Sequence, residues 1–182
     1  GSLYLAVRIS VETQPPLLST GARFLASGLI LLAVTPRARG FTFRRTWVPA
    51  IAPGILLIGS AGLLAIGEQE VPSGIASLIS ATIPFFMVLL GAAALRQRTR
   101  PLEWVGIAAG FAGAALLAGP GGEAPAWALA LVAASALGWA VGSVVAGTAA
   151  QEGGLLRAVA RQTVIGGAVV MAAGLAAGEA GT

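Results

Sequence analysis

The sequence contains no cysteine, histidine, aspartate or lysine, and each absence excludes a kind of chemistry. Zinc sites of the usual kind need cysteine or histidine. Ser-His-Asp and Cys-His catalysis need a histidine base, and a phosphate-binding P-loop needs its lysine. Without cysteine no disulfide can form. The charged side chains that remain are arginine and glutamate, so we expect no metal site, no cofactor, no catalytic residues and no enzyme.

Charge of either sign is also scarce. Only 10% of the residues are charged and 57% are hydrophobic, whereas a soluble domain carries about 25% charged residues. The mean hydropathy is +0.88. Polar and apolar residues do not alternate as they do in the strands of a membrane β-barrel. The composition therefore predicts an all-α, polytopic transmembrane helical bundle, with the lipid bilayer as its principal partner.

Long charge-free runs define the predicted membrane spans. Residues 71–95 carry no charge and are long enough to cross the ~30 Å hydrocarbon core as a helix. The basic turn RQRTR follows, and a second charge-free run occupies residues 104–122. These two runs predict a membrane hairpin. The whole chain divides in this way into seven predicted spans: 1–11, 17–34, 47–67, 74–95, 104–119, 126–147 and 162–177.

The distribution of arginine predicts the orientation of these spans. All eleven basic residues are arginine, and the loops after the second, fourth and sixth spans contain nine of them. The loops after the first, third and fifth spans contain only glutamate. Cytoplasmic loops are rich in arginine and lysine, so we place the even-numbered loops in the cytoplasm. This pattern also explains the isoelectric point of about 11.4, and we expect no nucleic-acid partner.

The sixth span repeats parts of the first. Five spans separate the two copies, so the second copy would be inverted in the membrane, as in many secondary transporters whose substrate site lies near the midplane. Chance similarity in a chain so rich in glycine and alanine is the alternative. The matching pairs are Gly1-Ser2 with Gly142-Ser143, Glu12 with Glu152, and Ala22-Arg23 with Ala160-Arg161.

Several segments together resemble a known family. They are PPLLSTGARFLASGLILL, EQEVPSGIASLISATIPFF, LEWVGIAAGFAGAALL and WALALVAASALGWAVGSV. They are similar to the EamA-type carriers of the drug/metabolite transporter superfamily, and EQEVPSG is closest to a subgroup of bacterial inner-membrane exporters. The resemblance implies a ten-helix carrier made of two inverted five-helix units around a central cavity. Residues 1–122 would then be the first unit and residues 123–182 the start of a truncated second unit.

The function that the resemblance implies is secondary transport, with export of small metabolites or drug-like solutes by alternating access. The chain starts and stops at apolar segments, so we expect it to be a piece of a longer protein. The alternative is a non-transporting helical module, or an inactive fragment, that assembles with partner helices. A homo-oligomer is left open.

Arg23 is the first candidate substrate-binding residue. It lies about two turns into the second predicted span, where an isolated guanidinium is unfavourable. It would bind an anionic group of the substrate. Alternatively, its side chain reaches the outer interface or pairs with Glu12 or Glu68.

Glu68 and Gln69 are candidates at the outer end of the third span. Glu68 would bind a substrate amine, or carry a coupling proton if burial raises its pKa. Alternatively, Glu68 is an exposed residue before the next helix.

Trp139 and Ser143, one turn apart in the sixth span, complete the candidate site. Tryptophan usually lies at the membrane interface, so its position in mid-membrane indicates a cavity wall. Ordinary packing is the alternative, and the sequence slightly favours it. Pro84 predicts either a kinked, cavity-lining helix or a harmless bend. The GxxxG pairs 106–110, 138–142 and 174–178 predict close helix packing.

Overall fold

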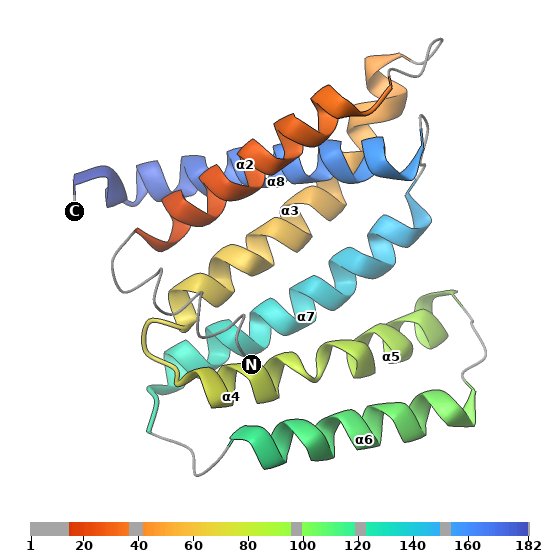
Figure 1. Cartoon of the computed structure of the whole chain (residues 1–182), viewed down its shortest axis with the longest axis vertical. Coiled ribbons are helices and arrows are strands. Elements are labelled where there is room, and N and C mark those ends of the chain that lie inside the picture. Colours follow the sequence, from red (N-terminus) through yellow and green to blue (C-terminus); the bar gives the residue numbers. More distant parts are fainter. Residues whose placement is uncertain (1–14, 37–41, 96–99, 119–122, 150–153, 182) are drawn as a thin grey trace.

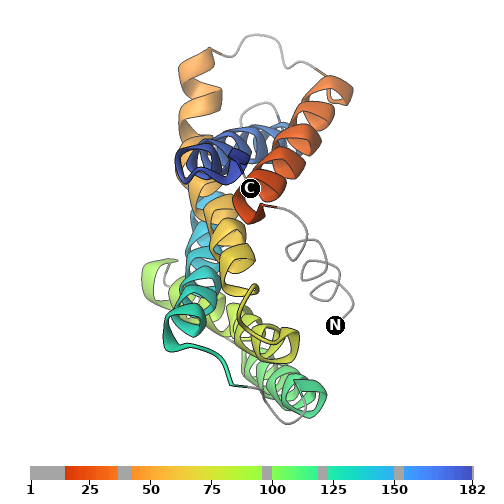
Figure 2. The ribbon, with the colours of Figure 1, turned by 90° about the vertical axis from the view of Figure 1, so that its left-hand side faces the viewer.

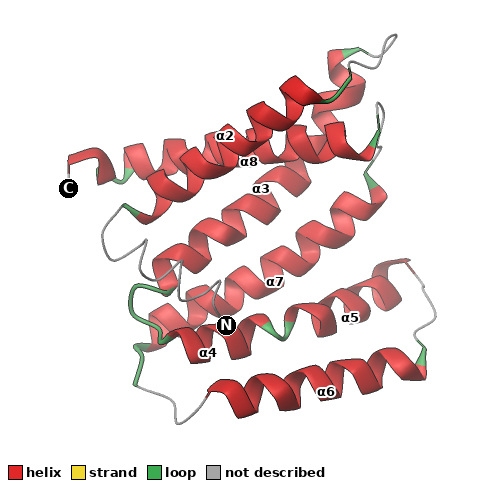
Figure 3. Cartoon of the chain, viewed as in Figure 1, coloured by secondary structure: helices red, strands yellow, loops and turns green. Residues whose placement is uncertain are grey.

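The computed structural model describes residues 15–36, 42–95, 100–118, 123–149 and 154–181. All regular structure in these residues is helical (Figure 3). The elements are α2 (Pro16–Val34), α3 (Phe43–Gly67), α4 (Ser73–Ser80), α5 (Ile83–Leu95), α6 (Pro101–Ala118), α7 (Ala126–Thr148), α8 (Leu155–Ala176) and the short 3-10 turn η1 (Glu179–Gly181).

The predicted helical membrane bundle is confirmed. Five stretches are long and apolar enough to cross a membrane: α2, α3, α4 together with α5, α7 and α8. The helix α6 occupies the predicted fifth span but is not among these five. The predicted first span, residues 1–11, lies outside the described residues. The predicted second and sixth spans agree with α2 and α7 to within a residue or two at each end.

The fourth span was predicted as one helix, and this is wrong in detail. Residues Ala81 and Thr82 form a turn that separates α4 from α5 (Figure 3). Pro84 follows the turn and has no N–H to donate to the carbonyl of Ser80. The proline therefore interrupts the helix instead of only bending it.

The predicted start of the seventh span is also wrong. The helix α8 begins at Leu155, not at residue 162, so Arg157 and Arg161 belong to the helix and not to the loop before it. Arginine is a good helix former, and its apolar stem packs along neighbouring helices. Arg161 is only 5% exposed, and charge alone therefore placed the helix boundary too late.

The helices follow one another along the longest axis of the molecule (Figure 1). The pair α2 and α8 lies at one end, α3 and α7 follow, and α5 and α6 lie at the other end. The contacts agree with this order, because α3 touches both α8 and α7, α7 touches α4 and α5, and α6 packs on α4. Viewed from the side, the end of α2 and the start of α3 diverge (Figure 2).

Glycine brings the helices together at their closest contacts. A Cβ placed on Gly21 of α2 would lie 2.5 Å from the backbone nitrogen of Met171 in α8. On α7, Gly138 faces Ser60 and Gly142 faces Leu56 and Leu57 of α3. Small residues let membrane helices approach in this way, so the 138–142 pair packs as predicted. In contrast, no atom of the described residues lies within 4 Å of the corresponding positions at 106 and 110 on α6.

A compact apolar cluster joins the end of α3 to α4 and α7. Its buried members are Val71, Ala76, Ala128 and Val132. Val71 belongs to the turn that links α3 to α4, so the cluster fixes this turn against α7. Glu68, the first candidate site residue described below, lies in this turn.

Candidate functional site

Glu68 is buried at the C-terminal end of α3. Its backbone N–H donates to the carbonyl of Leu64 at 2.8 Å, which completes the last turn of the helix. Its side chain is only 1% exposed and is among the largest fully buried side chains of the described residues. The sequence offered an exposed position as the alternative, and the structure instead buries this side chain. Buried carboxylates in membrane proteins commonly bind substrates, ions or protons.

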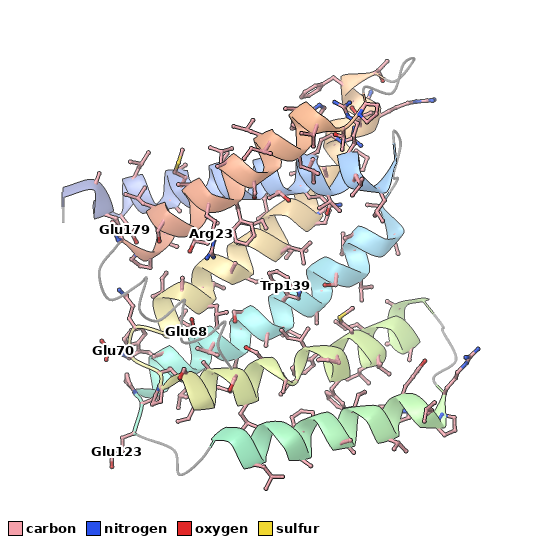
Figure 4. The ribbon with its side chains drawn as sticks, viewed as in Figure 1. Arg23, Glu68, Glu70, Glu123, Trp139 and Glu179 are labelled. Atoms are coloured by element: carbon pink, nitrogen blue, oxygen red, sulfur yellow. The ribbon has the colours of Figure 1, made fainter. Side chains whose placement is uncertain are left out.

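Gln69 and Glu70 follow Glu68 in the turn and are both exposed (Figure 4 labels the two glutamates). The turn is tight, because the N–H groups of Glu70 and Val71 both donate to the carbonyl of Gly67. Pro72 then fixes the start of α4. The local geometry therefore turns one of three consecutive polar side chains inward and leaves the next two outside.

Trp139 and Ser143 are joined to each other on α7. The hydroxyl of Ser143 donates to the carbonyl oxygen of Trp139 at 2.8 Å. Both side chains are half-buried. They lie next to Gly138 and Gly142, the two glycines that contact α3. The pair therefore borders the α3–α7 interface, about one turn apart along the helix.

Arg23 stands apart from these residues. Its side chain is exposed on α2, and its guanidinium carbon lies 5.3 Å from the ring centroid of its own neighbour Phe24. Such an exposed cation–π contact contributes about 0.5–1 kcal/mol. Figure 4 shows Arg23 on α2, Glu68 at the end of α3 and Trp139 on α7. Within the described residues, the structure does not join Arg23 to any other candidate.

The break between α4 and α5 adds polar backbone to the interior. Ser80, the last residue of α4, is 8% exposed, and its carbonyl cannot accept a hydrogen bond from Pro84. The hydroxyl of Thr82 donates to the carbonyl of Ile79 at 2.6 Å and so satisfies one group of the turn. Irregular backbone at this depth is tolerated only where protein or water surrounds it. The sequence predicted the proline effect but not the full interruption.

The sequence did not indicate a group of polar residues on α8 that are buried or hydrogen-bonded to a neighbouring helix. Arg161 and Gln162 are 5% and 7% exposed. Arg157 donates to the carbonyl oxygen of Thr35, the C-cap of α2, at 3.1 Å. The apolar run from Leu155 onward could have indicated that the helix starts before these charges. Nothing in the sequence indicated that Thr35 would receive Arg157.

These features define a class of protein: a multi-pass helical membrane protein with a buried carboxylate and an interrupted helix inside its bundle. Residues 1–119 match the EamA-like transporter family, and the chain belongs to that family. It is therefore a multi-pass transporter-family protein of the inner membrane, which is not a class of enzyme.

The names of curated relatives agree with this family assignment. The chain is 38% identical over 183 residues to the "Uncharacterized inner membrane transporter YedA" of Escherichia coli K12, with 98% of this chain and 59% of that protein covered. It is 31% identical over 174 residues to the "Uncharacterized transporter YvbV" of Bacillus subtilis, with 92% and 56% covered. A shorter match, 41% identical over 78 residues, is to the "Probable terminal-alkyne amino-acid exporter" of Streptantibioticus cattleyicolor, with 40% and 26% covered.

The chain thus spans about three fifths of the length of the first of these relatives. No solved structure matches it. The relatives therefore identify the family but not the substrate. We infer the kind of substrate from the side chains of the candidate site.

Proposed function

We propose that this chain is part of a secondary transporter that exports a small organic solute by alternating access, with Glu68 as the central polar group of the solute site. The observation that carries the proposal is the burial of the Glu68 side chain, which is 1% exposed at the C-terminal end of α3. Carboxylates inside membrane bundles are rare and commonly mark substrate, ion or proton sites. Binding a cationic group of the solute, or exchanging a coupling proton, are tasks suited to it.

The solute that best matches this carboxylate carries an amine. An ammonium group would donate charge-assisted hydrogen bonds to Glu68, and these are stronger than hydrogen bonds between neutral groups. The shorter match to a probable amino-acid exporter is consistent with such a solute. Gln69 would contact the solute at the outer opening. Trp139 and Ser143 would supply an apolar wall and a hydroxyl from α7.

Alternating access needs an element that can change shape. The interruption between α4 and α5 is such an element, because Ala81 and Thr82 separate two helices within one span. Hinges of transporters and enzymes commonly lie at a few residues between regular elements. Because α4 packs on α7 near the turn that contains Glu68, a movement at the break between α4 and α5 would displace groups at the proposed solute site.

The experiment is solute export by the complete gene product in cells that lack their own exporter. Glu68→Gln removes the charge and keeps the shape, and Glu70→Gln is the matched control, since Glu70 is exposed two positions further on. We expect Glu68→Gln to abolish export at equal expression and Glu70→Gln to leave it unchanged. Equal loss in both variants, or no loss in Glu68→Gln, would overturn the site.

Two further variants test the α7 contribution. Trp139→Ala and Ser143→Ala should raise the KM for the solute several-fold, because they remove contacts and not the central charge. If wild-type protein itself gave no export above background for any amine-bearing solute, a non-transporting helical module would be favoured instead.

A further inference from the structure

Arg157 holds its guanidinium where α8 begins and α2 ends. Its Nη1 donates to the carbonyl oxygen of Thr35, the C-cap of α2, at 3.1 Å, and its side chain is half-buried. Within the described residues, this is the only hydrogen bond that the Arg157 side chain makes. A guanidinium has further N–H donors in a planar fork whose geometry matches a phosphate group. These donors are therefore available to a ligand.

The helix ends around Arg157 are positively charged. Arg44 and Arg45 are both exposed in the first turn of α3, and the first turns of α3 and α8 contain no acidic residue. Every described glutamate lies beyond the other ends of α3 and α8, before α7, or in α6. An anionic ligand at Arg157 would thus meet attraction and no described carboxylate at this end of the bundle.

The register of α3 against α8 gives the depth of Arg157 in the membrane. Three contacts share one separation along the sequence, so the two helices are parallel and Trp47 is level with Leu155. The contacts are Gly54 with Gln162, Ile58 with Gly166, and Gly62 with Val170. Trp47 stacks on Phe43 with ring centroids 5.6 Å apart. Tryptophan marks the headgroup level of a membrane, so the start of α8 lies at that level.

One face of α8 is covered by neither α2 nor α3. The helix α2 contacts Val164, and α3 contacts Gly166. The remaining face begins at Arg157 and continues at helical spacing. Its exposed members are Ala168, Ala172 and Leu175.

Leu29 of α2 lies on the same side of the helix pair as Ala168. The Cβ positions of Gly28 and Gly167 lie 2.8 Å and 2.5 Å from a backbone nitrogen of the other helix. These contacts correspond when α2 and α8 are exchanged, so the residues that follow the two glycines face the same way. Leu29 is 52% exposed. Leu29 and Ala168 thus form an apolar surface across the pair, which we name the α2–α8 surface.

The distance from Arg157 to the α2–α8 surface suits a lipid. Ala168 lies about 16 Å along α8 from Arg157. This distance is about half of the ~30 Å hydrocarbon core, which is the depth of one leaflet. A molecule with a negative headgroup and acyl chains of one leaflet's length matches both the charge and the apolar surface.

We propose that the α2–α8 pair binds an anionic phospholipid of the predicted cytoplasmic leaflet. Arg157 holds its phosphate, and its acyl chains lie along the α2–α8 surface. Arginine binds phosphate oxygens through paired, charge-assisted hydrogen bonds. Basic sites between membrane helices on the cytoplasmic side bind anionic lipid headgroups. The proposal does not depend on the solute site at Glu68, and its test needs no transport substrate.

The test is native mass spectrometry of the complete gene product, purified in a mild detergent and mixed with equal amounts of phosphatidylglycerol and phosphatidylcholine. We expect the wild-type protein to retain several-fold more phosphatidylglycerol, and Arg157→Gln to lose most of this preference. Arg44→Gln is the matched control, because it removes an exposed arginine at the same end of the bundle, and it should keep the preference. Soluble glycerol phosphate should not displace the lipid, because it has no acyl chains.

Three results of this experiment would overturn the proposal. The first is equal retention of the two lipids by the wild-type protein. The second is an equal loss in Arg157→Gln and Arg44→Gln, which would indicate diffuse charge instead of a site. The third is displacement by glycerol phosphate, which would indicate a site for a free phosphate.

A second measurement uses only the wild-type protein, so it does not depend on how Arg157→Gln folds. Phosphatidylglycerol with a photoactivatable group in an acyl chain is incorporated into membranes that contain the complete gene product. It should label peptides from α2 and α8 more strongly than the corresponding phosphatidylcholine does. Equal labelling of these peptides by the two lipids would contradict the site.

Discussion

The carboxylate of Glu179 lies against the first turn of α2, where Oε2 accepts a hydrogen bond from the backbone N–H of Leu18 at 2.9 Å. The same oxygen accepts from the N–H of Leu17 at 3.0 Å. The first N–H groups of a helix have no partner within it, and Pro15, the N-cap, offers no side chain to receive them. A residue 161 positions away therefore caps the helix. This contact joins η1, the last described element, to α2, the first described helix.

Glu179→Ala should destabilise the protein. Loss of a helix N-cap costs about 1 kcal/mol, and loss of the favourable interaction between the carboxylate and the helix dipole adds about 0.3–1 kcal/mol. The measurement is thermal unfolding of the purified protein in detergent. Glu123→Ala is the control, since Glu123 is exposed before α7 and should leave the melting temperature unchanged. Equal melting temperatures for both variants would show that the cap contributes nothing.

Arg157→Gln should weaken the opposite end of the same helix. The guanidinium donates to the carbonyl oxygen of Thr35 at 3.1 Å, and a partly buried hydrogen bond from a charged group contributes about 1–2 kcal/mol. Because Arg157 and Glu179 bind opposite ends of α2, their effects should add. The double variant tests this by the same unfolding measurement, with Arg44→Gln, an exposed position, as control. A double variant no less stable than either single variant would contradict independent ties.

The sequence predicted five of the membrane-spanning segments because that information is local. An apolar run long enough to cross a bilayer must form a helix, since its backbone groups have no other partners there. The predicted ends of the second and sixth spans agree with the observed ends of α2 and α7 for this reason. The start of α8 did not, because Arg157 and Arg161 were counted as loop residues, and only tertiary contacts stabilise them inside the helix.

The candidate site could be predicted only in part. The sequence identified Glu68 as a polar residue at the end of a span, but it left open whether this side chain is exposed or buried, and the structure buries it to 1% exposed. The contact of Glu179 with α2 depends on two segments at opposite ends of the chain. Periodicity and spacing carry no information about such a contact.

Gly54→Ala and Gly110→Ala should change stability in opposite directions. A Cβ on Gly54 would lie 2.5 Å from the carbonyl oxygen of Gln162, so α3 and α8 must separate, at a cost of about 1–3 kcal/mol. In the described part of the chain, no atom lies within 4 Å of the Cβ position of Gly110, where alanine gains up to about 1 kcal/mol of helix propensity. Thermal unfolding of both variants checks the signs. Destabilisation by Gly110→Ala would show that this face of α6 packs against something outside the described chain.

Pro84→Ala should make the protein more stable and the transporter slower. The substitution restores an N–H that can donate to the carbonyl of Ser80, and a net hydrogen bond is worth about 0.5–1.5 kcal/mol. A continuous helix from α4 into α5 would no longer bend at Ala81 and Thr82, so the turnover number for solute export should fall while the KM changes little. Pro101→Ala is the matched control, because Pro101 is the first residue of α6, where proline costs the helix little. If Pro84→Ala raises the melting temperature but leaves export at the wild-type rate, the break is a packing feature and the hinge lies elsewhere.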